Sequence, residues 1–347
     1  GQLGPGGAIN AVTKQPTLDP LHEVNLEYGT YNRKQLSTDH GGKLDEDGRF
    51  AYRLTGLYRE SDTWVDYVQD DKAYLAPALS WYPSEDTVLT LQASYRRTDT
   101  KFAAPLSING TILPGTGGSM FPDDKFLGEP DFDRYESDTY TAGYKFEHDF
   151  QSPLKLRHSL RLYRSEVDWN YMQNGGFATS DLIYRRASER YETSNGLTSD
   201  TSLEITAATG PVEHTVLGGI DVYRSSYDTD RYYSSITTFS ISSLNYGADP
   251  AVDKSTNRGS KTETDQFGFY AQDQMKFDGH WTLLLGGRYD WFDSDVTSYQ
   301  TGTLTNTSDG AFTGRVGLVY VADNGLAPYV SYSESFSPVS GTDADGN

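Results

Sequence analysis

The sequence contains no cysteine among its 347 residues. A disulfide scaffold and a thiolate metal site are therefore excluded. Long apolar runs are also missing: hydrophobic residues make up 36% of the chain, and no segment approaches the roughly 20 consecutive apolar residues of a membrane helix. Positive charge is scarce, because 29 Lys and Arg stand against 49 Asp and Glu, a net charge of −20. This balance argues against nucleic acid as a partner.

A low mean hydropathy does not exclude a membrane. A transmembrane β-strand needs apolar residues only at alternate positions, so its average hydropathy stays low. Tyrosine is abundant, with 26 residues, and its apolar ring with a polar tip suits a membrane interface. The composition is therefore compatible with a β-barrel.

The stretch Gln266–Phe292 shows the expected strand pattern most completely. Asp278-Gly279 in its middle is a hairpin turn signal, because both residues tolerate positive φ. On either side, apolar and polar residues alternate for more than the five or six residues of a typical soluble strand. Long alternating strands with aromatic residues near both ends and a tight turn on one side are typical of a transmembrane barrel hairpin.

The stretch Arg49–Arg59 predicts which face meets lipid. Phe50, Leu54 and Tyr58 alternate with Arg49, Arg53 and Arg59. An arginine at mid-membrane costs about 2–4 kcal/mol. The arginines are therefore expected to face a wet, charged lumen and the apolar residues to face lipid.

The expected connections alternate between short and long along the chain. About 13 antiparallel strands result, with short turns on one rim and long loops on the other, as in outer-membrane barrels. The chain is thus predicted to be all-β, a transmembrane antiparallel β-barrel. An odd strand count and the lack of a starting Met or signal peptide lead us to expect a piece of a longer protein. Such a piece is expected not to close or fold alone. The long loops are predicted at Thr98–Glu136, Trp169–Arg190 and Asp228–Lys261.

Short runs in this sequence resemble one protein family along the whole chain. That family is the TonB-dependent outer-membrane siderophore receptors, and within it the hydroxamate branch that takes up chelates such as ferrichrome. The runs include GPGGAINAVTKQP (Gly4–Pro16), YLAPALSWYP (Tyr74–Pro83), GEPDFDRY (Gly128–Tyr135), VEHTVLGGIDVYR (Val212–Arg224), LGGRYDW (Leu285–Trp291) and FTGRVGLVYVADNGLAPYVSYSESFSP (Phe312–Pro338).

The resemblance implies a barrel of about 22 strands around an N-terminal plug. Residues 1–20 would be the end of the plug and its linker, and residues 21–347 the N-terminal part of the barrel. The implied location is the outer membrane of a Gram-negative bacterium. The implied activity is uptake of a ferric siderophore by a monomer, energised by the TonB–ExbB–ExbD complex through a segment before Gly1. The siderophore is the transported ligand, and neither a cofactor nor catalysis is implied.

A ferric hydroxamate complex already has its iron fully coordinated, so the receptor needs no metal ligands of its own. Aromatic rings of the upper loops and lumen would grip the organic shell. Each candidate could instead be a girdle or loop-packing aromatic. Lys101-Phe102-Ala103-Ala104-Pro105 replaces a Tyr- and Trp-bearing stretch of the ferrichrome receptor, which indicates a related but different siderophore. The candidate ligand-binding residues are Phe102, Tyr171, Phe177, Tyr232 and Tyr233.

Three alternatives remain open at this point. A passive porin would have no plug for Gly4–Pro16 to join. An outer-membrane enzyme would need Ser, His and Asp side chains that converge on one rim, whereas the six histidines lie in expected strands or near short turns. A receptor for haem, cobalamin or another chelate is the hardest to separate, because the variable loops and the plug select the substrate.

Overall fold

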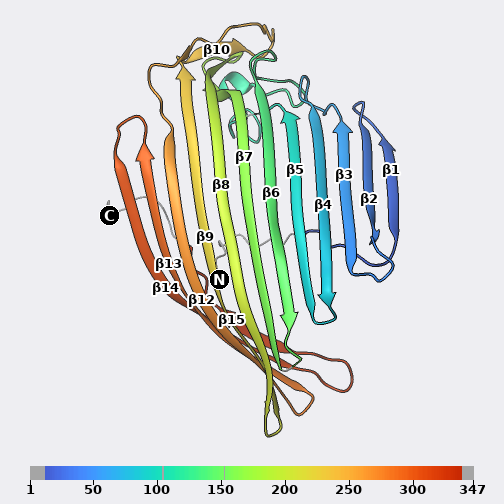
Figure 1. The fold of residues 1–347 in the computed structure, drawn as a ribbon. Helices are drawn as coiled ribbons and strands as arrows, with labels where there is room; N and C mark the ends of the chain where they lie inside the picture. The colour runs from blue at the N-terminus through green and yellow to red at the C-terminus, as the bar shows by residue number, and fades with distance from the viewer. Residues whose placement is uncertain (1–11, 104, 152, 338–347) are drawn as a thin grey trace.

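The computed structural model describes residues 12–103, 105–151 and 153–337, which form a single antiparallel sheet (Figure 1). Thirteen strands follow one another across the sheet in chain order, and two short strands, β10 and β11, pair with β8 and β9 beside this path. No helix in the described part of the chain is long and apolar enough to cross a membrane.

The strands have the following bounds: β1 Leu21–Tyr28, β2 Lys34–Lys43, β3 Phe50–Glu60, β4 Asp70–Ser84, β5 Thr87–Thr100, β6 Arg134–Asp149, β7 Leu154–Phe177, β8 Leu182–Thr209, β9 Val212–Ser234, β10 Thr237–Ser240, β11 Val252–Asp253, β12 Ser260–Phe277, β13 Trp281–Ser298, β14 Leu304–Tyr320 and β15 Tyr329–Ser333. A short 3-10 helix, η1, covers Thr116–Gly118.

The predicted hairpin at Gln266–Phe292 is confirmed as β12 and β13. Asp278 and Gly279 adopt φ of 58° and 66°, so these two residues of the three-residue turn Asp278–His280 have the positive φ values that the sequence predicted. Pairing continues without a shift from Phe277 opposite Trp281 to Ser260 opposite Ser298. The thirteen-strand path also agrees with the count expected from the sequence.

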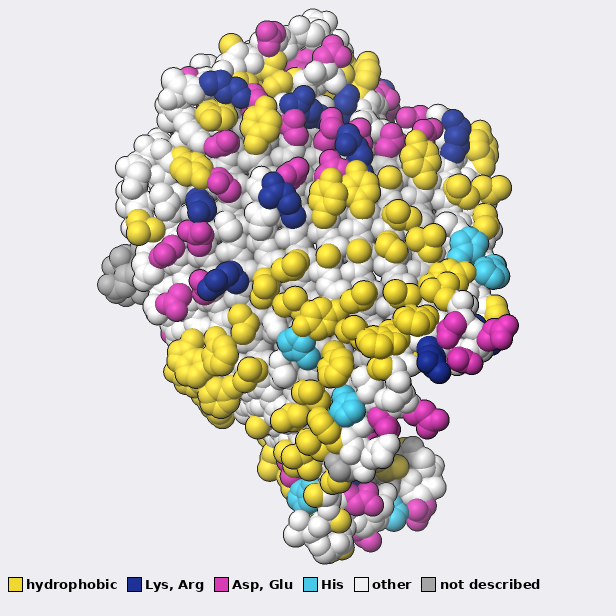
Figure 2. All heavy atoms as spheres, viewed as in Figure 1, with side chains coloured by type: hydrophobic (Ala, Val, Ile, Leu, Met, Phe, Trp, Pro, Cys, Tyr) yellow, Lys and Arg dark blue, Asp and Glu magenta, His cyan; other side chains and the backbone are white. Residues whose placement is uncertain are grey.

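One face of the sheet exposes a continuous apolar surface. On β12 and β13, Phe269 and Leu285 are 49% and 43% exposed although both are strongly apolar. Figure 2 shows such side chains as a band across the sheet, with charged side chains gathered above it. A surface of this size is unfavourable in water. It is the lipid-facing band of a barrel wall.

The opposite face is polar and carries the first described residues of the chain. Arg53 donates to Asp39 at 2.7 Å, and Lys14 reaches the same carboxylate at 2.6 Å. Gln92 donates to the Thr13 hydroxyl at 3.0 Å. Arg53, as predicted, is thus on the face away from lipid, and residues 12–20 run along this inner face. The part of the predicted plug strand before Val12 lies outside the described residues.

The prediction of a loop at Trp169–Arg190 is wrong, because most of these residues lie in strands. β7 continues to Phe177 and β8 begins at Leu182. The predicted loop from Asp228 likewise begins later, since β9 continues to Ser234. Above the membrane both faces of a strand meet water, so apolar alternation fades while backbone pairing continues. β8 has 28 residues, whereas about 9–11 suffice to cross a membrane, so β7–β9 rise well above the apolar band.

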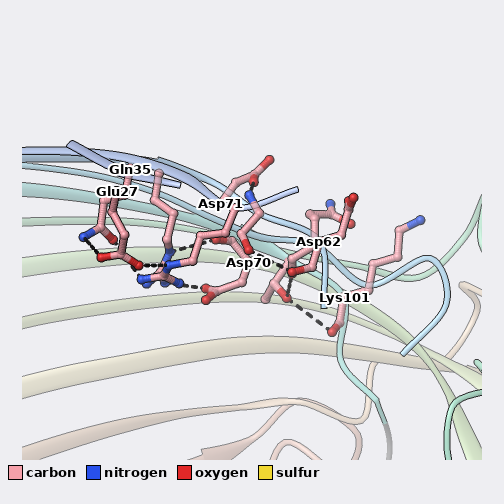
Figure 3. A network of polar contacts seen from close by, with 11 residues as sticks. Glu27, Gln35, Asp62, Asp70, Asp71 and Lys101 are labelled. Atoms are coloured by element: carbon pink, nitrogen blue, oxygen red, sulfur yellow. Dashed lines mark hydrogen bonds and ion pairs between the residues drawn. The ribbon is translucent and has the colours of Figure 1, made fainter. Parts of the chain in front are cut away.

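Polar side chains tie the upper ends of the first strands together (Figure 3). Arg33 donates to Glu27 at 2.5 Å and to Gln35 at 3.1 Å, which connects β1 and β2. Arg59 pairs with Asp70 at 2.6 Å across β3 and β4. These contacts link neighbouring strands at the rim.

Candidate ligand-binding site

An aromatic group lies high on the inner face of β7. Trp169 and Tyr171 stack with their ring centroids 4.9 Å apart. Phe102, from the loop after β5, sets its ring edge-on to both, at 5.1 and 5.4 Å. The side-chain alternation of β7 places Trp169 and Tyr171 on the same face as Arg161, which lines a groove beside Val12 on the inner side. Two predicted site residues, Phe102 and Tyr171, are therefore brought together.

Arg190 adds a cation to this group. Its register partner on β7 is Trp169, and its Cζ lies 4.7 Å from the Trp169 ring centroid and 5.2 Å from that of Tyr171. One guanidinium nitrogen donates to the Tyr171 hydroxyl at 2.7 Å. Arg190 thus holds both rings in place, and its Nε also donates to the Ser188 hydroxyl at 3.4 Å.

Tyr232 and Tyr233 lie on opposite faces of β9. Tyr233 pairs in register with Ser188, whose other neighbour is Tyr171, so it shares the inner face. Arg186 lies 4.2 Å from the Tyr233 ring centroid. Tyr232 pairs with Glu189 on the outer face and meets the Lys254 ammonium at 4.6 Å. The predicted placement of both tyrosines in a loop is wrong, because both are strand residues, as is Tyr171.

Phe177, at the end of β7, packs among the segments that follow β5 and β9, which we call the loop cap. Its ring lies 4.7 Å from that of Phe121, beside the buried cluster of Phe121, Leu127, Ile183 and Phe239. It belongs to strand β7 rather than to the predicted loop. Its surroundings are those of a packing residue that holds the loop after β5 on the β7–β8 hairpin.

A buried ion pair anchors that loop. Arg185 and Glu129 are 4% and 2% exposed and pair directly. Asp133 accepts hydrogen bonds from the amides of Glu129 and Met172, at 2.9 and 3.0 Å. Burial raises the pKa of Asp133 to about 7. The segment that carries Phe102 is therefore fastened to the strands that carry Tyr171.

Sequence reasoning missed Trp169, Tyr135 and Arg190, which belong to the same inner-face group. Tyr135 sets its ring edge-on to Trp169 at 5.8 Å. Strand alternation continued through the assumed loop would have placed them on one face. In the described part of the chain no three His, Asp or Glu side chains gather as metal ligands.

A profile of the TonB-dependent receptor-like β-barrel family matches residues 77–347. The chain belongs to this family. Its members are outer-membrane receptors of Gram-negative bacteria and not enzymes, so the outer membrane is the location of this chain too. The passive porin and the enzyme are thereby excluded as classes.

Two curated relatives are 31% identical to the chain. The ferrichrome outer membrane transporter/phage receptor of Escherichia coli K12 aligns over 373 residues, which cover 100% of this chain and 50% of the relative. The ferrioxamine B receptor of Salmonella typhimurium LT2 aligns over 348 residues, which cover 100% and 49%. The chain thus spans about half the length of the curated relatives it matches.

Solved structures share the fold at lower identity. The ferric-catecholate import receptor Fiu of Escherichia coli K12 superposes with a TM-score of 0.85 at 20% identity, over 96% of this chain and 53% of that one. BauA, the ferric preacinetobactin receptor of Acinetobacter baumannii, gives 0.82 at 19% identity, over 96% and 50%. At these identities the two superpositions show that the chain shares the fold of these receptors.

Proposed function

We propose that the protein is an outer-membrane receptor and TonB-energised importer of ferric siderophores of the hydroxamate type. The observation that carries the proposal is the 31% identity to receptors named for ferrichrome and ferrioxamine B, over the whole chain. We further infer that residues 12–20 continue from a plug that fills the barrel, because they follow the inner face and bind Asp39 and Gln92 there.

The aromatic group of Phe102, Trp169 and Tyr171 is the proposed contact for the chelate. Its rings lie at the upper end of the inner face, where a ligand from outside arrives first. Flat aromatic faces suit the hydrocarbon shell of an iron chelate, and the Arg190 guanidinium can donate to its oxygens. Tyr233 on the same face is included in this proposal, and Phe177 and Tyr232 are not.

The direct test is binding of ferric chelates to the full-length protein in detergent, followed by intrinsic tryptophan fluorescence. Quenching by ferrichrome or ferrioxamine B, and none by their iron-free forms, is the expected result. A response only to ferric catecholates, haem or cobalamin would keep the receptor class and overturn the hydroxamate assignment. Energised uptake is then measured with radioactive iron in cells with and without TonB.

Site variants locate the contact. Tyr171→Ala and Phe102→Ala should each weaken binding about tenfold, because loss of a buried aromatic anchor costs roughly 1–2 kcal/mol. Tyr232→Ala is the matched control, since it removes the same ring from the outer face of β9. Equal affinities for Tyr171→Ala and Tyr232→Ala would remove the aromatic group from the site.

A further inference from the structure

Four arginines near the aromatic group have no ion-pair partner among the described residues. This is unexpected in a chain with 49 acidic and 29 basic residues, where most arginines on the sheet are paired. In the described part of the chain their side chains contact aromatic rings, hydroxyls and the Gln173 amide. We call them the arginine patch: Arg186, Arg190, Arg231 and Arg258.

The arginine patch is continuous and lies on the inner face. Arg190 and Arg231 are register partners on β8 and β9. Arg186 and Arg258 both approach the ring of Tyr233, with Cζ 4.2 and 5.9 Å from its centroid. The Arg258 amide also donates to the Arg231 carbonyl at 2.8 Å. The four cations therefore surround one part of the wall, beside Trp169 and Tyr171.

Buried donors within this region lack acceptors. The Nε of Arg231 and the Nε1 of Trp169 are buried and have no hydrogen-bond partner in the described part of the chain. Two acids beside the patch form no ion pair with its arginines in the described part of the chain, although Asp253 interacts with Arg258 electrostatically. Glu192, on the same face of β8, interacts with Tyr227, and Asp253 is held by Ser255. Unsatisfied buried donors are costly, and together with the four arginines they give this region an excess of donors and of positive charge.

We propose that the arginine patch selects ferric chelates that carry net negative charge. This inference rests on the proposed function and narrows its substrate class. Each hydroxamate group carries one negative charge, so a complete set of hydroxamates only neutralises ferric iron. The additional negative charge must come from another part of the ligand, and a carboxylate is the group that a guanidinium fork binds best. The substrate class is therefore a hydroxamate chelate that bears free carboxylate.

The test compares three derivatives of one ferric hydroxamate that share the iron centre and differ in net charge. Ferrioxamine B carries a free amine, its acetylated derivative has no net charge, and its succinylated derivative ends in a carboxylate. Affinities for the full-length protein are measured by fluorescence quenching at low and at high salt. The succinylated form is expected to bind about tenfold more tightly than the amine form at low salt, with a smaller ratio at high salt, because screening weakens exposed charge pairs.

Arg231→Gln is the informative variant, since among the described residues the Arg231 side chain forms no hydrogen bond or ion pair whose loss would disturb the fold. It should reduce the preference for the succinylated over the acetylated form several-fold. Arg224→Gln is the control, because Arg224 lies on the same strand, pairs with Asp265 and is largely exposed. It should leave both affinities unchanged.

The outcomes separate the two proposals. Equal affinity for the three derivatives, or an equal effect of both variants, overturns the charge selection while the hydroxamate receptor stands. Failure of all three derivatives, together with binding of a ferric catecholate or ferric citrate, overturns the hydroxamate assignment and this inference with it. Tighter binding of the succinylated form that depends on Arg231 supports both.

Discussion

Asp133 shows at the scale of single residues how the loop that carries Phe102 is held. Its carboxyl is buried between two backbone amides, beside the ion pair of Arg185 and Glu129. A buried ion pair contributes little net stability when intact, but its disruption leaves an unpaired buried charge and costs about 3–5 kcal/mol. The buried ion pair therefore fixes the position of the loop that carries Phe102 and adds little to the net stability of the protein.

The anchor should weaken as the pH rises from about 4 to about 7. Burial raises the pKa of Asp133 to about 7 from 3.8, so the native state holds a proton that the unfolded state has lost. The stabilisation is complete below the unfolded pKa and is lost as the pH passes the native one. Hydrogen exchange at the Met172 amide, corrected for its intrinsic pH dependence, should show less protection at pH 8 than at pH 5.

Asp133→Asn should abolish this difference in protection, because an amide does not titrate in this range. Asp123→Asn, an exposed carboxylate of the same loop, should retain it. Identical protection at both pH values in the unchanged protein would contradict the prediction.

At the scale of the strands, the sequence was informative only where lipid lies on one side. Within the apolar band, Phe267 and Phe269 alternate with polar residues, and the hairpin turn at Asp278-Gly279 could be predicted with its conformation. Above the band, Trp169 and Arg190 gave no alternating signal, because solvent and loops cover both faces there. Backbone pairing between the consecutive strands β7, β8 and β9 maintains that region, and no apolar alternation marks it in the sequence.

Two adjacent glycines of β9 provide a test of close strand packing. A Cβ on Gly219 would lie 2.5 Å from the Tyr270 ring, which crosses the inner face to bond Asp200 at 2.9 Å. Gly219→Ala should therefore lower the free energy of unfolding by about 1–3 kcal/mol. Urea unfolding of the full-length protein in detergent measures this change.

Gly218→Ala is the control on the other face, where an added Cβ meets nothing nearer than 3.9 Å. It should stay within about 0.5 kcal/mol of the unchanged protein. Equal effects of the two substitutions would contradict the assignment of faces in β9.

At the scale of the whole molecule, the alternation of apolar and polar side chains along each strand divides the sheet into a lipid face and an inner face. This division was predictable from Arg49–Arg59 alone. The candidate site was predictable only in part: Phe102 and Tyr171 converge, while Phe177 packs in the loop cap and Tyr232 faces outward. Those outcomes depend on strand length above the membrane.

Leu162→Arg and Ser159→Arg place the same charge on the two faces of β7. Leu162 is exposed within the apolar band, so an arginine there should cost about 2–4 kcal/mol if it reaches mid-membrane depth. Ser159 lines the inner groove beside Arg161 and should tolerate the change. Folding of the full-length protein into lipid vesicles, followed by its heat-modifiable mobility on gels, gives the comparison. Equal folding yields would contradict the assignment of the two faces.

The height of β7–β9 has a consequence for how this protein can change over time. Above the membrane, Arg190 lies on the inner face, where we propose that the chelate binds, while its neighbour Tyr191 is exposed on the outside. Antibodies and other large molecules in the surroundings reach only the outside, and nutrient supply acts only on the inside. If the proposed function holds, adjacent codons of one strand are under different selective pressures, and substitutions on the outer face leave chelate binding unchanged.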